Sequence, residues 1–391
     1  MEGPAERAGE DEDLEEKAMA VAGPLAELGE AEDSLDTDLD SDQETEGIHG
    51  HRELAKDPLC LRSCQTHSLM PASSFLRQRI AEELNVRHRS LGPQGAQAVA
   101  STLAANPSIK RLDLRDNGLC GTGAEVLAAV LSKSSSICDV DLSENQLGAA
   151  GAQALCAALA ENQTVQKIQL AGNCLEEQAA QHLATFLLAQ TSVKSLDLSY
   201  NHLNDRAGEI LGPALAENTG LTELNISWNH LRGSGATAFA KGLEANIFLK
   251  VLDISYNGFG DSGASAIGEA LKTNNVLEEL NLSNNRISMV GALSLGLGLQ
   301  VNQTLRILVV SRNPMRSEGC FGLLKSVRNN PASTLELLDF SDIQVNREFD
   351  DFASSVKVIL PGLCLKTGSP RPEYKKELLP IFKPSSPASN H

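Results

Sequence analysis

Hydrophobic and polar positions recur along this chain in a frame that repeats at every twenty-eighth residue. One position of each period is asparagine, and a leucine, isoleucine or valine stands three and five residues before it. The asparagines are Asn117, Asn145, Asn173, Asn201, Asn229, Asn257, Asn285 and Asn313. The alternation before each asparagine is typical of a strand with one buried face. Eight copies in phase therefore predict eight short strands, one in each period.

The second half of each period has helical spacing. Leu155 and Leu159, for example, stand four residues apart on an alanine-rich background that favours a helix. One strand and one helix cannot bury their apolar faces alone, but stacked copies can. The sequence therefore predicts an α/β solenoid, a horseshoe with a parallel β-sheet on the concave side and helices on the convex side.

Two sets of asparagines follow from this arrangement. The eight listed above are interpreted as a structural ladder, because a carboxamide can bind the backbone of its own and the next turn. A second set follows the helices, where we expect left-handed backbone; its members are Asn162, Asn218, Asn246, Asn274, Asn302 and Asn330. Alanine in place of Asn229 should cost more stability than at Asn313, which we expect near a frayed end.

The frame resembles the leucine-rich repeat family of the ribonuclease-inhibitor type. That type has α/β units of about 28 residues and Gly-Ala pairs entering the helix, seen here at Gly235-Ala236, Gly263-Ala264 and Gly291-Ala292. Upstream, the run from Cys64 through Phe75-Leu76-Arg77 to Leu84-Asn85-Val86 is similar to the entry segment of the leucine-rich-repeat-containing 74 proteins. The resemblance implies a solenoid over about residues 54–345 and no defined activity.

Composition divides the chain further. Residues 1–46 hold 18 of the acidic residues and two basic ones, so they carry −16 of the net charge of −18. We expect an acidic disordered arm (1–46), a linker and N-terminal cap or degenerate first repeat (47–83), leucine-rich repeats (84–345), a cap helix (346–365) and a Pro-rich flexible tail (366–391). Thr37 and Ser41 each precede an acidic residue by three positions, a pattern that acidophilic kinases prefer.

Several classes of function are disfavoured. Outside the arm the charge is nearly balanced, which argues against a nucleic-acid partner, and no apolar run approaches the ~18–20 residues of a membrane span. The acidic start does not resemble a secretory signal, so we expect a cytoplasmic or nuclear protein with reduced thiols. Cys60, Cys64 and His67 form the one metal-like cluster, at non-standard zinc spacing, and Cys60 and Cys64 can equally belong to a cap repeat. We expect no metal, no cofactor and no catalytic residues.

The predicted concave face is acidic. Parallel strands place equivalent residues of successive periods as neighbours, ~4.8 Å from each other, and the inward columns that begin at Arg111, Asp113, Arg115 and Asp116 hold eleven acids against four bases. The helical outside is therefore expected to be relatively basic. An alternative for the Asp113 column is that its side chains satisfy backbone groups at the strand ends.

Aromatic residues concentrate in one column. Tyr200, Trp228 and Tyr256 occupy equivalent positions, and the chain has one tryptophan and three tyrosines in total. We predict that these rings bind a protein partner together with Asp197, Glu223, Asp253 and His230, with His202 beside His230. The alternative is that large residues seal the edge of the sheet.

These patterns predict a monomeric, non-catalytic intracellular adaptor or scaffold that binds a protein with a basic or arginine-bearing segment. The alternative is a regulator of a small GTPase, as in the Ran GTPase-activating proteins, which share this repeat subtype. Repeats in that group vary in length, whereas the eight here have no insertion that could present a catalytic loop.

Overall fold

A computed structural model describes residues 82–368 of the protein. In this part of the chain, eleven parallel strands form one sheet in sequence order, with helices α3–α12 alternating between them. The strands are β1 (Glu83–Asn85), β2 (Arg111–Asp113), β3 (Asp139–Asp141), β4 (Lys167–Gln169), β5 (Ser195–Asp197), β6 (Glu223–Asn225), β7 (Val251–Asp253), β8 (Glu279–Asn281), β9 (Ile307–Val309), β10 (Leu337–Phe340) and β11 (Cys364–Thr367).

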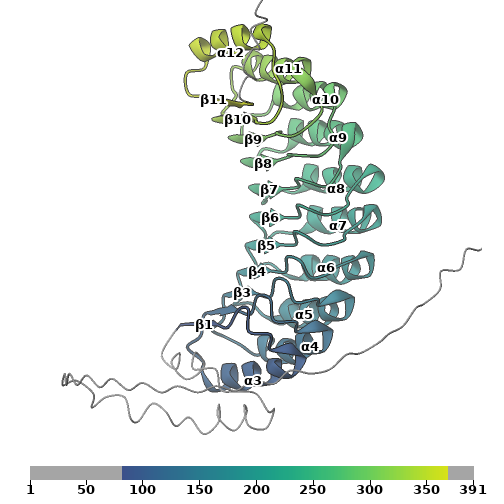
Figure 1. Cartoon of the computed structure of the whole chain (residues 1–391), viewed down its shortest axis with the longest axis vertical. Coiled ribbons are helices and arrows are strands. Elements are labelled where there is room, and N and C mark those ends of the chain that lie inside the picture. The colour runs from purple at the N-terminus through teal and green to yellow at the C-terminus, as the bar shows by residue number, and fades with distance from the viewer. Residues whose placement is uncertain (1–81, 369–391) are drawn as a thin grey trace, which may run out of the picture. The chain divides into compact units, whose positions relative to one another are not determined.

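The helices lie on one side of the sheet and the other side is open (Figure 1). They are α3 (Gly92–Ala105), α4 (Cys120–Leu131), α5 (Gly148–Glu161), α6 (Glu177–Ala189), α7 (Asp205–Glu217), α8 (Gly233–Ala245), α9 (Gly260–Thr273), α10 (Met289–Leu299), α11 (Arg316–Asn329) and α12 (Arg347–Ile359). The prediction of a leucine-rich-repeat solenoid is thus confirmed.

The strand register follows the sequence period. Leu224 pairs with Leu252 and Leu252 with Leu280, so partners stand one period apart, and the same interval holds from β1 to β9. In β1 to β9 the middle residue of each strand is buried, whereas its two neighbours face the open side. A two-residue insertion lengthens the interval between β9 and β10. The sheet therefore arranges equivalent residues of successive repeats in lateral columns.

Close helix packing depends on glycine in the centre of the solenoid. A Cβ atom on Gly242 of α8 would overlap the carbonyl oxygen of Gly212 in α7, so no larger residue fits there without moving the backbone. Phe239 and Leu243 of α8 fill the space between this helix layer and the sheet. Small residues on one helix stripe and large ones on the next thus fix the distance between neighbouring repeats.

The strand-end asparagines form a continuous hydrogen-bonded ladder. Asn145 Nδ2 donates to the carbonyl oxygens of Leu114 and Leu142, both at 2.9 Å, and its Oδ1 accepts from the backbone N–H of Asn117 at 3.0 Å. All eight are at most 5% exposed. Each side chain therefore joins its own turn to the turn of the preceding repeat.

The helix-end asparagines form a second ladder, and the expectation of left-handed backbone there is wrong. Asn218, Asn246 and Asn274 have φ between −71° and −74°, in the extended region. Asn274 Nδ2 donates to the carbonyls of Leu243 (2.8 Å) and Asn246 (3.0 Å) in the preceding repeat. Gln190 holds the equivalent place in its repeat and donates to Leu159 and Asn162. These residues connect repeats instead of relieving a strained turn.

The C-terminal end is closed by a helix and an additional strand. Phe349 and Val356 of α12 are buried, and the rings of Phe349 and Phe340 meet edge to face at 5.7 Å. Strand β11 follows and pairs with β10 through Thr367, which the sequence placed beyond the cap, in the flexible tail. The acidic arm with Thr37 and Ser41, the segment with Cys60, Cys64 and His67, and residues 369–391 lie outside the described residues.

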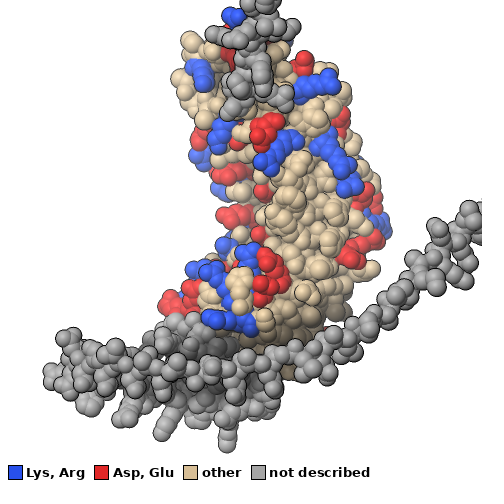
Figure 2. All heavy atoms as spheres, viewed as in Figure 1, with Lys and Arg blue, Asp and Glu red and all other residues tan. Residues whose placement is uncertain are grey.

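The expectation of a basic helical side is also wrong. Helices α3–α12 carry more aspartate and glutamate than lysine and arginine. On the face shown in Figure 2, much of the helical flank in the middle of the solenoid is uncharged, and acidic and basic side chains both appear along the strand side. The compensating positive charge of the sequence therefore does not lie on the described helices.

Candidate functional site

Three aromatic rings form a stack on the open side of the sheet. The ring centroids of Tyr200 and Trp228 lie 5.0 Å apart at an interplanar angle of 12°, and those of Trp228 and Tyr256 lie 3.9 Å apart at 9°. Tyr200 is 57% exposed and Trp228 43% exposed, whereas Tyr256 is half-buried. We call these three residues the aromatic stack. Such an exposed, ordered set of rings is typical of a binding surface.

The backbone beneath the stack is in the left-handed region. Tyr200, Trp228 and Tyr256 have φ of 54°, 54° and 56°, as do the other residues of this column at similar values. Glycine, asparagine and aspartate tolerate this conformation best, whereas a bulky residue there is unusual and costs about 1–3 kcal/mol. The column does hold Gly172 and Asn284 in adjacent repeats. Local backbone preference therefore does not explain the aromatic residues.

The acidic side chains on the central strands are in no ion pair among the described residues. Ion pairs on the concave face lie toward its ends, for example Arg111 with Asp139 at 3.3 Å and Lys366 with Asp339 at 3.7 Å. Within residues 82–368, no basic group lies within ion-pair distance of Asp197, Glu223 or Asp253. The central repeats, which also carry the aromatic stack, thus hold three carboxylates outside any ion pair of the described residues, with Lys167 of β4 as a basic residue of the same cavity.

Some of these carboxylates also accept hydrogen bonds from the backbone. Oδ1 of Asp197 accepts from the backbone N–H of Ser199 at 2.8 Å, and Oδ1 of Asp253 does the same for Ser255 at 2.9 Å. One oxygen of each of these carboxylates therefore satisfies a backbone N–H at the strand end, as the alternative for this column proposed. Oδ2 of Asp253 accepts from Asn281 at 2.9 Å. Glu223, in the other inward column, is exposed and makes no such bond among the described residues.

A shallow cavity lies on the sheet in the same repeats. Its volume is about 250 Å³, and its lining includes Lys167, Asp197, Glu223 and Asp253 from strands β4 to β7. On the rim, the exposed rings of His202 and His230 lie 5.9 Å apart and nearly parallel, as their shared repeat position predicts. The residues singled out in the sequence thus occupy adjoining columns of the central repeats.

The stack has one contact that the sequence did not predict. Arg312 Nη1 donates to the Tyr256 hydroxyl at 2.5 Å, across the intervening Asn284, while its Nε donates to Asp342 at 2.8 Å. The carboxylate of Asp342 and then the hydroxyl of Tyr256 raise the pKa of Arg312. The sequence places Arg312 and Tyr256 in one column, but nothing in the repeat pattern predicts that an arginine side chain extends over two repeats.

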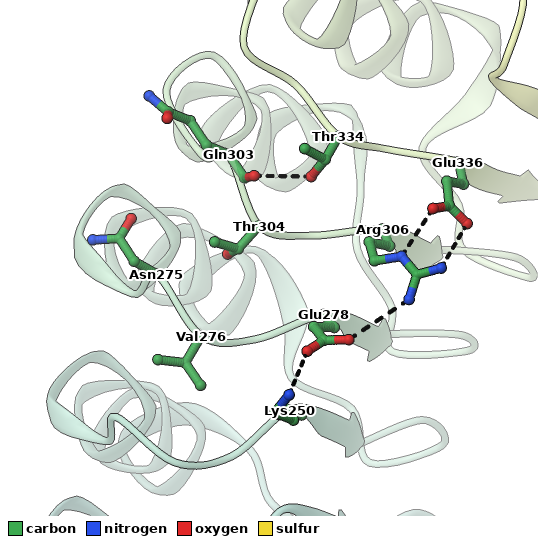
Figure 3. Close-up of a pocket in the computed structure, with 9 residues that line it drawn as sticks. All are labelled: Lys250, Asn275, Val276, Glu278, Gln303, Thr304, Arg306, Thr334 and Glu336. Carbon is green, nitrogen blue, oxygen red and sulfur yellow. Dashed lines mark hydrogen bonds and ion pairs between the residues drawn. The ribbon is translucent and has the colours of Figure 1, made fainter.

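A second hollow lies at the edge where the chain enters the strands (Figure 3). Glu278 lies between Lys250 (2.8 Å) and Arg306 (3.7 Å), and Arg306 also pairs with Glu336 at 2.9 Å. The hydrogen bond from Lys250 lowers the pKa of Glu278, and that with Glu336 raises the pKa of Arg306. Because these four charged side chains pair with one another, few charged groups of the hollow are free to bind a ligand.

Chemistry for catalysis does not gather in the described residues. No three of the His, Cys, Asp and Glu side chains in residues 82–368 are placed to hold a metal ion. Burial raises the pKa of the Cys156 and Cys320 thiols to about 12, so neither supplies a thiolate at neutral pH. None of the helices in this part of the chain has the length and apolarity that crossing a bilayer requires.

Comparisons with known proteins agree with the fold. The Leucine Rich repeat family model matches residues 105–128, 133–156, 189–211, 217–240, 245–268, 273–296 and 301–324. Human leucine-rich repeat-containing protein 74B is 81% identical over 389 residues, covering 100% of this chain and 99% of the human one. The mouse protein of that name is 67% identical over 111 residues, 28% of each chain.

Two solved structures of low sequence identity resemble part of the chain. The actin-binding site 2 of leiomodin-1 is 19% identical with a TM-score of 0.32, covering 37% of this chain and 87% of that one. The C-terminal domain of tropomodulin from Caenorhabditis elegans is 15% identical with a TM-score of 0.33, covering 38% and 92%. These likenesses carry no argument about ligands. The identity of 81% with the human protein extends over the full length of both chains. It shows that the chain belongs to the leucine-rich repeat proteins and, within them, to the leucine-rich repeat-containing 74B family.

Proposed function

We propose that this protein is a non-catalytic adaptor or scaffold of the cell interior, active as a monomer, that binds a protein partner on its concave face. Leucine-rich repeat solenoids generally use that face for binding proteins. The binding residues are the aromatic stack of Tyr200, Trp228 and Tyr256 and its neighbours Asp197, Glu223, Asp253 and His230.

The observation that carries the proposal is the exposed aromatic stack on left-handed backbone. Three large rings occupy positions whose φ favours glycine or asparagine, and the same repeats hold acids that are in no ion pair among the described residues. Tryptophan and tyrosine dominate binding hot spots. Carboxylates outside any ion pair favour a partner segment rich in lysine or arginine, which can also make cation–π contacts with the rings.

Comparative capture from cells tests the proposal. The full chain, the Trp228→Ala variant and the Asn284→Ala variant are each used as bait, and retained proteins are identified. Asn284 shares the column, the exposure and the left-handed φ of 50°, so its variant controls for the backbone. Proteins retained by the wild type and the Asn284 variant but lost with Trp228→Ala support the proposal. Identical protein sets with all three baits would overturn it.

The GTPase-regulator alternative receives no support from the repeat geometry. Strands β1 to β9 follow one another at a constant interval of one period, so the repeats they span contain no inserted loop. A GTP-hydrolysis assay with small GTPases separates the two functions. We expect the full chain to leave turnover unchanged, and stimulated turnover would replace the adaptor proposal with the alternative.

A further inference from the structure

The aromatic stack is closed at one end and open at the other. At the closed end, Arg312 lies between Tyr256 and Asp342 and hydrogen-bonds to both. At the open end, the next position of the column is Gly172, which has no side chain to cover Tyr200. Because the rings of Tyr200 and Trp228 are nearly parallel, the second face of Tyr200 is turned toward the repeat that holds Gly172.

The space above Gly172 lies between the free face of Tyr200 and the side chain of Glu144. Neighbouring repeats lie ~4.8 Å apart, so Glu144 stands two repeats, on the order of 10 Å, from Tyr200. Within the stack itself, one ring per repeat gives centroid distances of 3.9–5.0 Å. A planar group at the level of Gly172 would thus cover the free face of Tyr200, and its edge, where guanidinium N–H groups donate, would meet the Glu144 carboxylate.

Glu144 supplies negative charge at the far side of this space. Its Cγ atom lies 3.1 Å from the position that a Cβ on Gly172 would take, so its side chain borders the space directly. Its Oε1 accepts two bonds from Arg115, at 3.2 Å and 2.5 Å, while Oε2 accepts none from the described residues. A carboxylate with one unused oxygen therefore faces an uncovered tyrosine ring.

We infer that Tyr200, Gly172 and Glu144 form a slot for the guanidinium group of an arginine in the protein partner, an inference that rests on the proposed function. A guanidinium is planar and permanently charged, stacks on aromatic faces and donates to carboxylates, whereas the ammonium of lysine has no plane to insert. At the closed end the chain's own Arg312 also contacts a tyrosine and an acid, there through the Tyr256 hydroxyl and the Asp342 carboxylate. The slot presents an uncovered tyrosine face and the second oxygen of a carboxylate whose first oxygen binds Arg115.

The most direct test of the slot is a variant whose own side chain fills it. Gly172→Tyr extends the stack by one ring, and the left-handed φ of +65° is one that Tyr200, Trp228 and Tyr256 already adopt. Gly172→Ala is the matched control, because it places an L-residue at the same left-handed φ without a ring, and the closest contact of its methyl group is the flexible side chain of Glu144, at 3.1 Å from Cγ. Tyr200→Ala removes the stacking face, and Glu144→Gln removes the charge.

The probe is an acetylated Gly-Arg-Gly amide peptide, with lysine and citrulline versions as controls for planarity and charge. Trp228, the sole tryptophan of the chain, reports binding by fluorescence. Protection of the exposed Cys174 from alkylation is a second readout, with Cys364 as an internal control. The full chain is used, and the thermal transition of each variant verifies that it folds.

We expect the wild type and Gly172→Ala to bind the arginine peptide with dissociation constants within about twofold of each other. Gly172→Tyr, Tyr200→Ala and Glu144→Gln should each raise the constant about fivefold or more, which is about 1 kcal/mol at 1.4 kcal/mol per tenfold change. Equal binding by Gly172→Tyr, equal binding of the citrulline peptide, or no saturable response of the wild type at millimolar peptide would overturn the slot. Partner capture that depends on Trp228 would still support the proposed function in those cases. If instead the arginine peptide binds as predicted but partner capture does not depend on Trp228, the slot would be supported and the proposed function overturned.

Discussion

The Nδ2 group of Asn229 donates to the carbonyl oxygen of Leu198, in the preceding repeat, at 2.9 Å. The same group contacts the carbonyl oxygens of Ile226 and Ser227, and Oδ1 accepts from the N–H of Leu203 at 3.0 Å. Truncation would leave these buried backbone groups without partners. We predict that Asn229→Ala lowers the free energy of unfolding by about 1–3 kcal/mol, measured by urea denaturation.

The structure changes the corresponding expectation for Asn313. Its side chain is 5% exposed, makes the same three donor contacts and accepts from two backbone N–H groups. Strands β10 and β11 follow it, so it is not at a frayed end. We now expect Asn313→Ala to cost as much as Asn229→Ala, and negligible shifts for both would show that the ladder does not hold the turns.

The second ladder permits a comparison between adjacent residues. Asn274 is 3% exposed and bridges two repeats, whereas Asn275 is exposed and contacts only its own turn. Asn274→Ala should therefore destabilise the protein by about 1–3 kcal/mol and Asn275→Ala by less than about 0.5 kcal/mol. Chemical denaturation measures both, and equal costs would argue against a bridging role.

The sequence period predicted the fold because it reports burial directly. Leu224 and Asn229 occupy the same environment as their equivalents in other repeats, so their identities recur. The residue types Tyr200 and Trp228 do not indicate a left-handed backbone, whereas Gly172 and Asn284 in the same column do. Strand β11 pairs through backbone atoms after α12 folds back, and its residues lack the repeat frame. The positions of the ion pairs depend on side-chain reach, which a pattern of residue types does not encode.

The acidic arm should be dispensable for folding. Residues 1–46 carry −16 of the net charge of −18 and contain no aromatic residue or isoleucine that could join a core. Deleting them should leave the melting temperature nearly unchanged and raise the isoelectric point above its present value of about 4.9. Calorimetry and isoelectric focusing test this, and a large loss of stability would mean that the arm contributes to the folded structure.

Two buried thiols should be protected in the folded protein. Burial raises the pKa of Cys156 and of Cys320 to about 12, so alkylation at pH 8 should reach the exposed Cys174 long before either of them. Because the unfolded thiols ionise at lower pH than the folded ones, their contribution to stability is complete below the unfolded pKa and falls as the pH rises toward 12. Peptide mass spectrometry after timed alkylation provides the check, and rapid labelling of Cys156 would contradict the burial described.

The central claim is that the aromatic stack binds a partner, and the partner's dissociation constant for wild type and Trp228→Ala tests it most directly when the melting temperatures are measured alongside. We predict a loss of affinity of about 2 kcal/mol or more. Trp228 is partly exposed, and its stacking contributes about 1 kcal/mol, so the melting temperature should fall by no more than about 4 °C. A variant that melts much earlier yet binds the partner with unchanged affinity would show that the rings serve packing, and it would contradict this account.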